Sequence, residues 1–177
     1  MTTINGACAA ITGAAAGIGA GLARRLAAQG CDLALADLDV AAVDELAKEL
    51  RSRHGRQVSV HKVDVSQREQ VEAFAAAAIK QHPRLNIVVN NAGVALFGML
   101  HELDLADIEW LMNINFWGVV HGTRAFLPHL RQQPEAHVVN LSSIFGIIAP
   151  PGQTAYCAAK FAVRGFSESL RHELQQT

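Results

Sequence analysis

The sequence predicts a three-layer α/β fold, with helices on both faces of a parallel sheet of about five strands. Short apolar segments alternate with longer amphipathic segments along the chain, which is the pattern of successive β–α–β units. Half of the 177 residues are hydrophobic but only 6% are aromatic, a balance that favours packed helices over a β-sandwich. No linker or repeat interrupts the pattern, so residues 1–177 are expected to form a single domain.

Five segments have the length and composition of strands buried in a sheet. They are residues 7–12, 32–37, 57–63, 85–90 and 136–142. The fourth (LNIVVN) is rich in β-branched residues, and the third (QVSVHKV) alternates between apolar and polar side chains.

The segments between and after these strands have helical periodicity. The predicted helices are residues 17–29, 40–53, 67–81, 105–132 and 153–175. In the first of them, Ile18, Leu22 and Leu26 recur at four-residue spacing and share one face. Ser66 precedes the third, with Glu69 three residues further on, so Ser66 is the predicted N-cap.

Charge and cysteine content exclude several classes of protein. The 15 basic and 16 acidic residues form no basic stripe, which argues against a nucleic-acid partner. The apolar runs are too short to cross a bilayer and the N-terminus lacks the layout of a secretory signal, so we expect a cytoplasmic protein with no membrane partner. The scattered histidines and Cys8, Cys31 and Cys157 lack metal-ligand spacing, so we expect reduced thiols and no metal site.

A glycine-rich turn, TGAAAGIG at residues 12–19, lies between the first predicted strand and the first predicted helix. Small residues let the backbone approach a pyrophosphate closely, and the helix N-terminus offers free N–H groups. No lysine follows the turn, which excludes an ATP-binding P-loop. A tight turn without a ligand is the alternative. The predicted dinucleotide-binding residues of this turn are Gly13, Ala16, Gly17, Ile18 and Gly19.

Asp37 ends the second predicted strand, 18 residues after Gly19. A carboxylate there would accept hydrogen bonds from the adenosine ribose and would repel a 2′-phosphate. The glycine-rich turn also lacks Arg and Lys, so the sequence favours NAD over NADP. The alternative is an acidic residue that is only solvated at the end of a strand.

Tyr156 and Lys160 are four residues apart near the start of the last predicted helix, so they share a face. A phenol has a pKa near ~10 and exchanges protons poorly at neutral pH, but a nearby ammonium stabilises the phenolate. The alternative is an ordinary surface pair. Ser142 and Ser143 follow the fifth predicted strand, where a hydroxyl could donate to a substrate oxygen or merely cap a turn.

Asn115 and Asn113 lie inside the long helix predicted over residues 105–132. Asparagine is a poor helix former. A mid-helix asparagine that disrupts the local hydrogen bonds can hold a water molecule, which would suit a proton relay. Nothing in the local sequence shows which of the two asparagines would hold the water.

Six motifs, in this order and spacing, make the chain resemble the short-chain dehydrogenase/reductase family over essentially its full length. They are TGAAAGIG at 12–19, Asp64-Val65, NNAG at 90–93, NINFWG at 113–118, NLSS at 140–143 and YCAAK at 156–160. The resemblance implies a Rossmann-type sandwich with strand order 3-2-1-4-5. It also implies an NAD-dependent oxidoreductase that transfers hydride reversibly between nicotinamide and an alcohol or ketone, without a metal. A homodimer or homotetramer is expected from the family and from the apolar faces of the last two long helices.

The resemblance also implies a role for each matching residue. Tyr156 would be the catalytic acid/base, and Lys160 its activator and ribose anchor. Ser143, thirteen residues before Tyr156, would orient the carbonyl, and Asn115 would hold the relay water. The remaining cofactor-binding residues implied are Asp64 and Val65 beside the adenine, and Asn91, Ala92 and Gly93 beside the ribose.

Length is the main departure from the family, whose members usually continue through further strands after the last helix. The predicted sheet therefore lacks the family's last strands and leaves residues 136–142 as a bare edge. The alternative function is a truncated dinucleotide-binding or interaction protein with little or no activity. A smaller departure is Ala159, where the family commonly has serine.

Residues 144–151 (IFGIIAPP) form an apolar run between the predicted catalytic Ser143 and Tyr156. The run is suited to the wall of a substrate pocket. Packing in the core or between subunits is an equally good interpretation.

Overall fold

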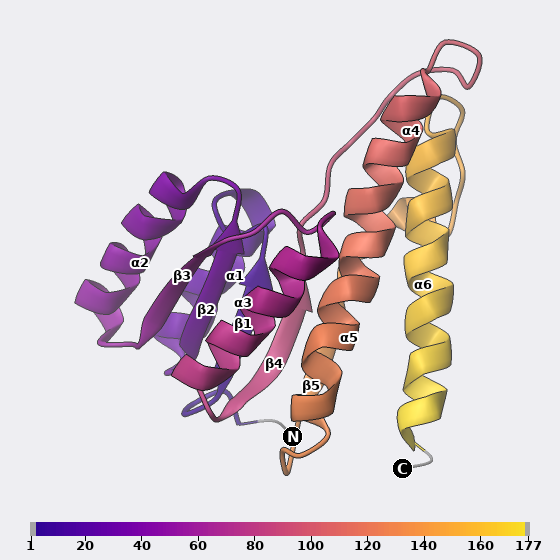
Figure 1. Ribbon diagram of the computed structural model, residues 1–177. Coiled ribbons are helices and arrows are strands. Elements are labelled where there is room, and N and C mark those ends of the chain that lie inside the picture. The colour runs from indigo at the N-terminus through magenta and orange to yellow at the C-terminus, as the bar shows by residue number, and fades with distance from the viewer. Residues whose placement is uncertain (1–2, 176–177) are drawn as a thin grey trace.

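The computed structural model describes residues 3–175 and contains a parallel sheet with the strand order β3-β2-β1-β4-β5 (Figure 1). The strands are β1 (Cys8–Thr12), β2 (Asp32–Asp37), β3 (Val58–Lys62), β4 (Leu85–Asn90) and β5 (His137–Asn140). This order and the Rossmann-like α/β architecture confirm the predicted fold class. Strand β1 is entirely buried, whereas β5 lies at an edge of the sheet with Val139 43% exposed.

Helices cover both faces of the sheet. They are α1 (Gly17–Ala28), α2 (Val40–His54), α3 (Arg68–Gln81), α4 (Leu105–Met112), the π-helical turn η1 (Asn113–Trp117), α5 (Gly118–Leu130), the 3₁₀ turn η2 (Ile144–Gly146) and α6 (Thr154–Gln175). In Figure 1, α4, η1 and α5 form one continuous rod with α6 running beside it. The upper ends of α4 and α6 project beyond the carboxyl ends of the strands, together with the loop that follows β4.

Two apolar layers fill the space between the sheet and its helices. On one face, Leu33 of β2 packs with Leu46 of α2 and Ala23 of α1. On the other face, Phe74 of α3 and Phe126 of α5 meet edge to face, with ring centroids 5.4 Å apart. The alternation of side chains along each strand sends successive residues into the two layers.

The long helix predicted over residues 105–132 is not continuous. Residues Asn113–Trp117 form a π-helical turn, in which Gly118 N donates to Asn113 O. Asn and aromatic residues are weak helix formers, and Asn115 uses its side chain to bond outside the helix. The wider turn is therefore found where the helical propensity is lowest, and such turns are common at functional sites.

The prediction of Ser66 as the N-cap of the third helix is wrong. Helix α3 begins at Arg68, its N-cap residue is Gln67, and no side chain caps it. The Ser66 hydroxyl instead donates to Asp64 Oδ1 at 2.7 Å, because that carboxylate lies two residues earlier in the same turn. A charged acceptor competes better for the hydroxyl than the backbone N–H groups of the helix do.

All three cysteines are free and buried. Burial raises the pKa of Cys31 to about 12, so its sulfur is a protonated thiol at neutral pH. Within residues 3–175, no helix combines the length and the apolar character that crossing a bilayer demands.

Candidate active site

A cleft of about 660 Å³ opens at the carboxyl ends of the strands, where open parallel sheets bind ligands. It brings together most of the predicted site residues: Gly13, Ala16, Gly17, Ile18, Asp37, Asn91, Ala92, Gly93, Tyr156 and Lys160. A smaller hollow of about 160 Å³ shares several of these residues and adds Asp64 and Val65. Gly19, Asn115 and Ser143 line neither space.

The glycine-rich turn is shaped by two close approaches that exclude side chains. A Cβ on Gly19 would lie 2.1 Å from Gly13 O, and a Cβ on Gly13 would lie 2.8 Å from Ala92 Cα. Gly13 and Gly17 also have positive φ angles of 67° and 54°. Within the described residues, no side chain caps the first turn of α1, which begins at the cleft-lining residue Gly17.

Asp37 supports the turn as well as lining the cleft. Its Oδ2 accepts a hydrogen bond from Ala15 N at 2.9 Å, and its Oδ1 accepts one from Asp39 N at 3.1 Å. Asp39 also lines the cleft, and Asp64 lines the adjoining hollow. This end of the site is therefore rich in carboxylates.

Thr12 and Asn91 tie the glycine-rich turn to the segment after β4. The Asn91 side chain donates from Nδ2 to Thr12 O at 2.9 Å and to Gly13 O at 3.0 Å. In return, Thr12 Oγ1 accepts from the backbone nitrogens of Asn91 at 3.1 Å and Ala92 at 3.2 Å. The four hydrogen bonds fix the two cleft-lining segments against each other.

The two candidate asparagines have different surroundings. Asn115 is fully buried, and its side chain exchanges two hydrogen bonds with the backbone of Val94, both 2.8 Å long. Asn113 is exposed. A Cβ built on Gly93 would lie 3.3 Å from Asn115 Oδ1 and 3.8 Å from Lys160 Nζ, so the buried Asn115 lies close to two residues that line the cleft.

Lys160 is almost entirely buried on α6, one helical turn after Tyr156. Its Nζ donates to Leu141 O at 2.9 Å and lies 5.6 Å from the centroid of the Tyr156 ring. Burial lowers the pKa of Lys160, because desolvation disfavours the ammonium. The arrangement holds the Lys160 ammonium beside the face of the phenol ring.

The two candidate serines bond differently. Ser142 Oγ donates to the backbone oxygen of Lys160 at 3.1 Å, and Ser142 lines the cleft. Ser143 Oγ accepts from Phe145 N at 3.2 Å and caps η2. The Phe145 ring in turn meets the Tyr156 ring edge to face, with centroids 6.2 Å apart.

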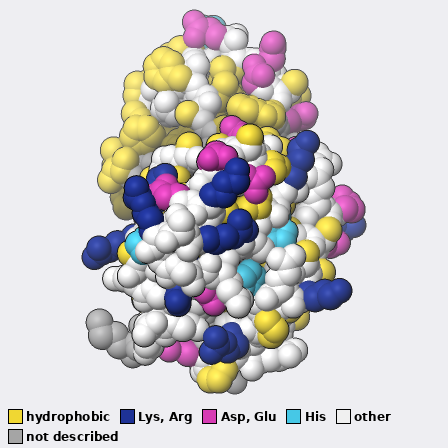
Figure 2. All heavy atoms as spheres, turned by 90° about the vertical axis from the view of Figure 1, so that its left-hand side faces the viewer, with side chains coloured by type: hydrophobic (Ala, Val, Ile, Leu, Met, Phe, Trp, Pro, Cys, Tyr) yellow, Lys and Arg dark blue, Asp and Glu magenta, His cyan; other side chains and the backbone are white. Residues whose placement is uncertain are grey.

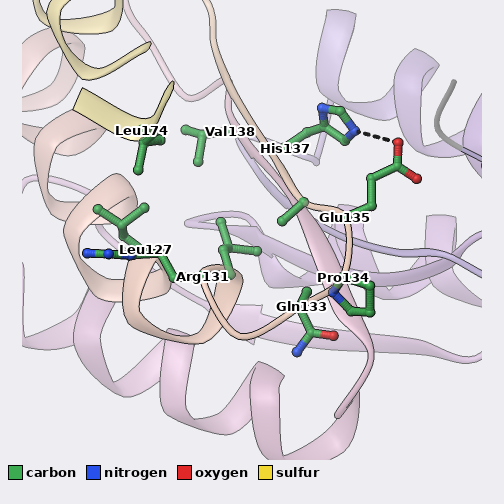
Figure 3. A pocket seen from close by; sticks show the side chains of 10 residues that line it. Leu127, Arg131, Gln133, Pro134, Glu135, His137, Val138 and Leu174 are labelled. Atoms are coloured by element: carbon green, nitrogen blue, oxygen red, sulfur yellow. Dashed lines mark ion pairs between the residues drawn. The ribbon is translucent and has the colours of Figure 1, made fainter. Parts of the chain in front are cut away.

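A second pocket, of about 280 Å³, lies at the opposite end of β5 between α5 and the end of α6 (Figure 3). Leu127, Val138 and Leu174 supply apolar walls, and a Glu135–His137 ion pair of 3.7 Å borders it. It shares no residue with the cleft and contains no predicted site residue. The chemistry of the candidate site therefore belongs to the cleft.

Sequence reasoning missed Thr12, Asp39, Val94 and Leu141. The sequence could have indicated a role for Thr12. A hydroxyl at the end of a buried strand, beside the glycine-rich turn, has few possible partners except the loop after the neighbouring strand. Val94 and Leu141 act through their backbone atoms. No side-chain pattern identifies such residues in advance.

Comparison with known proteins gives consistent matches. The short chain dehydrogenase family matches residues 7–177. SadH of Mycobacterium tuberculosis is 47% identical over 98% of this chain, which spans 63% of that relative. Oxidoreductase UcpA of Salmonella typhimurium is 37% identical over the whole chain, which covers 67% of its length.

Solved structures are similar as well. A short chain dehydrogenase/reductase from Burkholderia phymatum in complex with NAD is 38% identical, with a TM-score of 0.96 over 99% of this chain and 63% of that one. An alcohol dehydrogenase from Thermococcus sibiricus complexed with 5-hydroxy-NADP is 33% identical, with a TM-score of 0.90 over 94% of this chain and 70% of that one.

Proposed function

The chain belongs to the short chain dehydrogenase family, and from this premise we propose that it is the dinucleotide-binding and catalytic part of an NAD-dependent oxidoreductase that interconverts an alcohol and a ketone. The observation that carries the proposal is that Tyr156 and Lys160 line the same cleft as the glycine-rich turn. The turn suits a dinucleotide, and the Tyr–Lys pair suits proton exchange at the end of the cleft where hydride would be transferred.

The cradle fits a dinucleotide. The missing side chains at Gly13 and Gly19 leave the backbone of the turn open to a pyrophosphate, which the N-terminus of α1 would attract. Asp37 would accept hydrogen bonds from the adenosine ribose. Similar proteins have been solved with NAD and with NADP, which supports a nicotinamide dinucleotide. Our preference for NAD rests on the carboxylates of Asp37, Asp39 and Asp64, which disfavour a 2′-phosphate.

The proposed reaction uses the chain's residues for the proton and for orientation. The bound NAD supplies the hydride acceptor. Tyr156 takes the hydroxyl proton of the alcohol while its carbinol C–H bond breaks, so that the products are a ketone, NADH and a proton. Lys160, 5.6 Å from the ring centroid, stabilises the phenolate and would bond the nicotinamide ribose. Ser143 would donate to the substrate oxygen, and Asn115 would hold the water that passes the proton to solvent.

Replacing Tyr156 by Phe tests this proposal. We expect kcat/KM for alcohol oxidation to fall by ~100-fold or more, since general acid–base catalysis contributes that much. NADH binding, followed by its fluorescence, should change little, because the ring and Lys160 remain. Activity that survives the substitution would refute the role of Tyr156. Tight NADH binding by the unmodified protein without turnover of any alcohol or ketone would instead favour the alternative, a dinucleotide-binding protein.

We also propose a homodimer or homotetramer. Support comes from the exposed edge of β5, where Val139 is 43% exposed, and from apolar side chains that remain exposed on α6, such as Phe161. Light scattering at micromolar concentration tests it, and a monomer would contradict it.

A further inference from the structure

Two loops lie beside Tyr156: residues 94–104 after β4 and residues 141–153 after β5. They are joined by a hydrogen bond in which Gly98 N donates to Gly152 O at 3.0 Å. Phe97 covers the same point, since a Cβ on Gly152 would lie 3.0 Å from its ring. The second loop also touches the catalytic residue directly, through the Phe145–Tyr156 ring contact.

Both loops expose large apolar side chains. Phe97, Met99 and Leu100 of the first loop and Ile144, Ile147 and Ile148 of the second are between 47% and 76% exposed. Figure 2 shows hydrophobic side chains gathered in the upper part of the molecule, while most Lys and Arg side chains lie lower. Ile144, Ile147 and Ile148 of the apolar run 144–151 therefore do not pack in the core of residues 3–175. Such patches usually mark a binding surface.

Charge is nearly absent where a substrate would lie. Residues 141–153 (LSSIFGIIAPPGQ) contain no acidic, basic or histidine side chain. Among the described residues, Lys160 is the one lysine or arginine lining the cleft, and it is buried and bonded to Leu141 O. The first loop carries Glu102 and Asp104, which would repel an anion, together with one histidine, His101. Apart from His101, neither loop offers a cationic side chain that could pair with a substrate carboxylate or phosphate.

We propose that the substrate is a neutral secondary alcohol, or the matching ketone, whose reacting carbon carries a large apolar substituent held between these two loops. The inference rests on the proposed function, since it assumes that the reacting oxygen lies at Tyr156. We assign the apolar surface to the substrate because Phe145, which lies in the second loop, contacts the Tyr156 ring. Hydroxy acids, sugars and phosphorylated alcohols are expected to be poor substrates.

The first test compares substrates of graded length and charge. With NAD, kcat/KM should rise about threefold to fourfold per methylene from 2-butanol through 2-hexanol to 2-octanol. The anion 2-hydroxyoctanoate should be ~100-fold worse than 2-octanol, because its carboxylate would lose water without gaining a partner. A flat series, or a preference for the hydroxy acid, would overturn the inference while leaving the proposed function intact.

The second test needs no turnover. Unreactive N-alkylformamides carry a carbonyl oxygen and an alkyl chain, and their binding to the NADH complex can be followed by NADH fluorescence. Affinity should rise from N-ethylformamide to N-hexylformamide. If it rises although no alcohol is oxidised, the apolar site stands and the proposed function fails. If alcohols are oxidised but affinity does not rise with length, the apolar site is refuted.

A variant locates the site. Ile147→Ser should lower kcat/KM for 2-octanol by about tenfold more than for 2-butanol, because only the longer chain reaches the loop. Leu174→Ser, which also replaces an exposed apolar residue but at the far end of α6, should leave the ratio unchanged. A change of oligomeric state in Ile147→Ser without a change in this ratio would show that a second copy covers the loop, and would overturn the inference.

Discussion

The side chain of Asn115 pairs with the backbone of Val94 as a neighbouring strand would: Val94 N donates to Asn115 Oδ1, and Asn115 Nδ2 donates to Val94 O, both at 2.8 Å. One buried side chain thus satisfies both polar groups of a residue in an irregular loop. It also joins the π-helical turn to the segment that lines the cleft.

Asn115→Leu should destabilise the protein by about 2 kcal/mol, since two hydrogen bonds to the partly buried Val94 backbone are lost. Urea denaturation measures the change. Asn113→Leu, two residues away but exposed, is the matched control and should stay within ~0.5 kcal/mol of the original protein. Equal stability of the two variants would show that the pairing contributes nothing.

Gly122→Ala should destabilise the protein by ~2 kcal/mol or more, because the new Cβ would lie 2.0 Å from Asn90 Oδ1. Asn90 is buried and bonded to Thr123 and Asn140, so it has little room to move. In α1, a Cβ on Gly21 would have no described atom outside its own helix within 4 Å. Gly21→Ala should therefore stabilise the protein by ~0.5–1 kcal/mol. Thermal unfolding distinguishes the two, and effects of the same sign would contradict the packing described for α5.

Ser143→Ala should lower kcat/KM by ~100-fold if its hydroxyl donates to the substrate oxygen, an effect typical of removing one donor to the reacting oxygen. Ser142→Ala should cost far less, since that hydroxyl is already bonded to Lys160 O. Steady-state kinetics on both variants decides between them. A larger loss in Ser142→Ala would reverse the assignment.

Asp37→Asn should raise the affinity for NADPH relative to NADH by ~10-fold, because a charge that repels the 2′-phosphate is removed while an acceptor for the turn remains. Lys62, which lies opposite Asp37 in the register of β2 and β3, could then attract the phosphate. Fluorescence titration with both dinucleotides measures the ratio. A preference of the unmodified protein for NADPH would show that the Asp37 carboxylate does not exclude the 2′-phosphate.

Stability should fall as the pH drops below about 6.5, the usual pKa of histidine. His61 Nε2 and His82 Nε2 lie 2.9 and 3.0 Å from the single hydroxyl of Ser59, and burial lowers the pKa of both rings. Below this pH the two histidines bind protons in the unfolded chain but stay neutral in the folded chain. Their contribution to the free energy of unfolding is therefore fully present above pH ~6.5 and is lost progressively below it. Urea midpoints from pH 8 to 5 measure the effect. His82→Gln should flatten the profile, and an unchanged slope would exclude this cluster as its source.

The sequence predicted every strand to within about two residues at each end, because buried parallel strands read as short apolar runs. It failed where a side chain bonds to a group that the helical pattern does not reveal. Asn115 bonds to Val94, which no helical periodicity reveals, and so the predicted continuous helix contains a π-helical turn. The Ser66 hydroxyl donates to Asp64 Oδ1 and does not cap the helix that follows it.

In the candidate site, too, some features could be predicted from the sequence and others could not. Asp37, Tyr156 and the glycine-rich turn were predicted to serve one site, and they line one cleft. The acceptor of the Lys160 ammonium, Leu141 O, could not be predicted, because a backbone carbonyl is present in every residue. The choice between Ser142 and Ser143 rests on an interval in the sequence and awaits the kinetic test.

The hydrogen bonds between Thr12 and Asn91 have a consequence for the order of folding. They join residues 79 apart in the chain, so the glycine-rich turn is held in shape by a segment that is synthesised much later. Contacts of such long range form late, since the loop between them must first be closed. Nucleotide-binding competence should therefore appear only once β4 has docked beside β1, and the first strand, turn and helix alone should not acquire it.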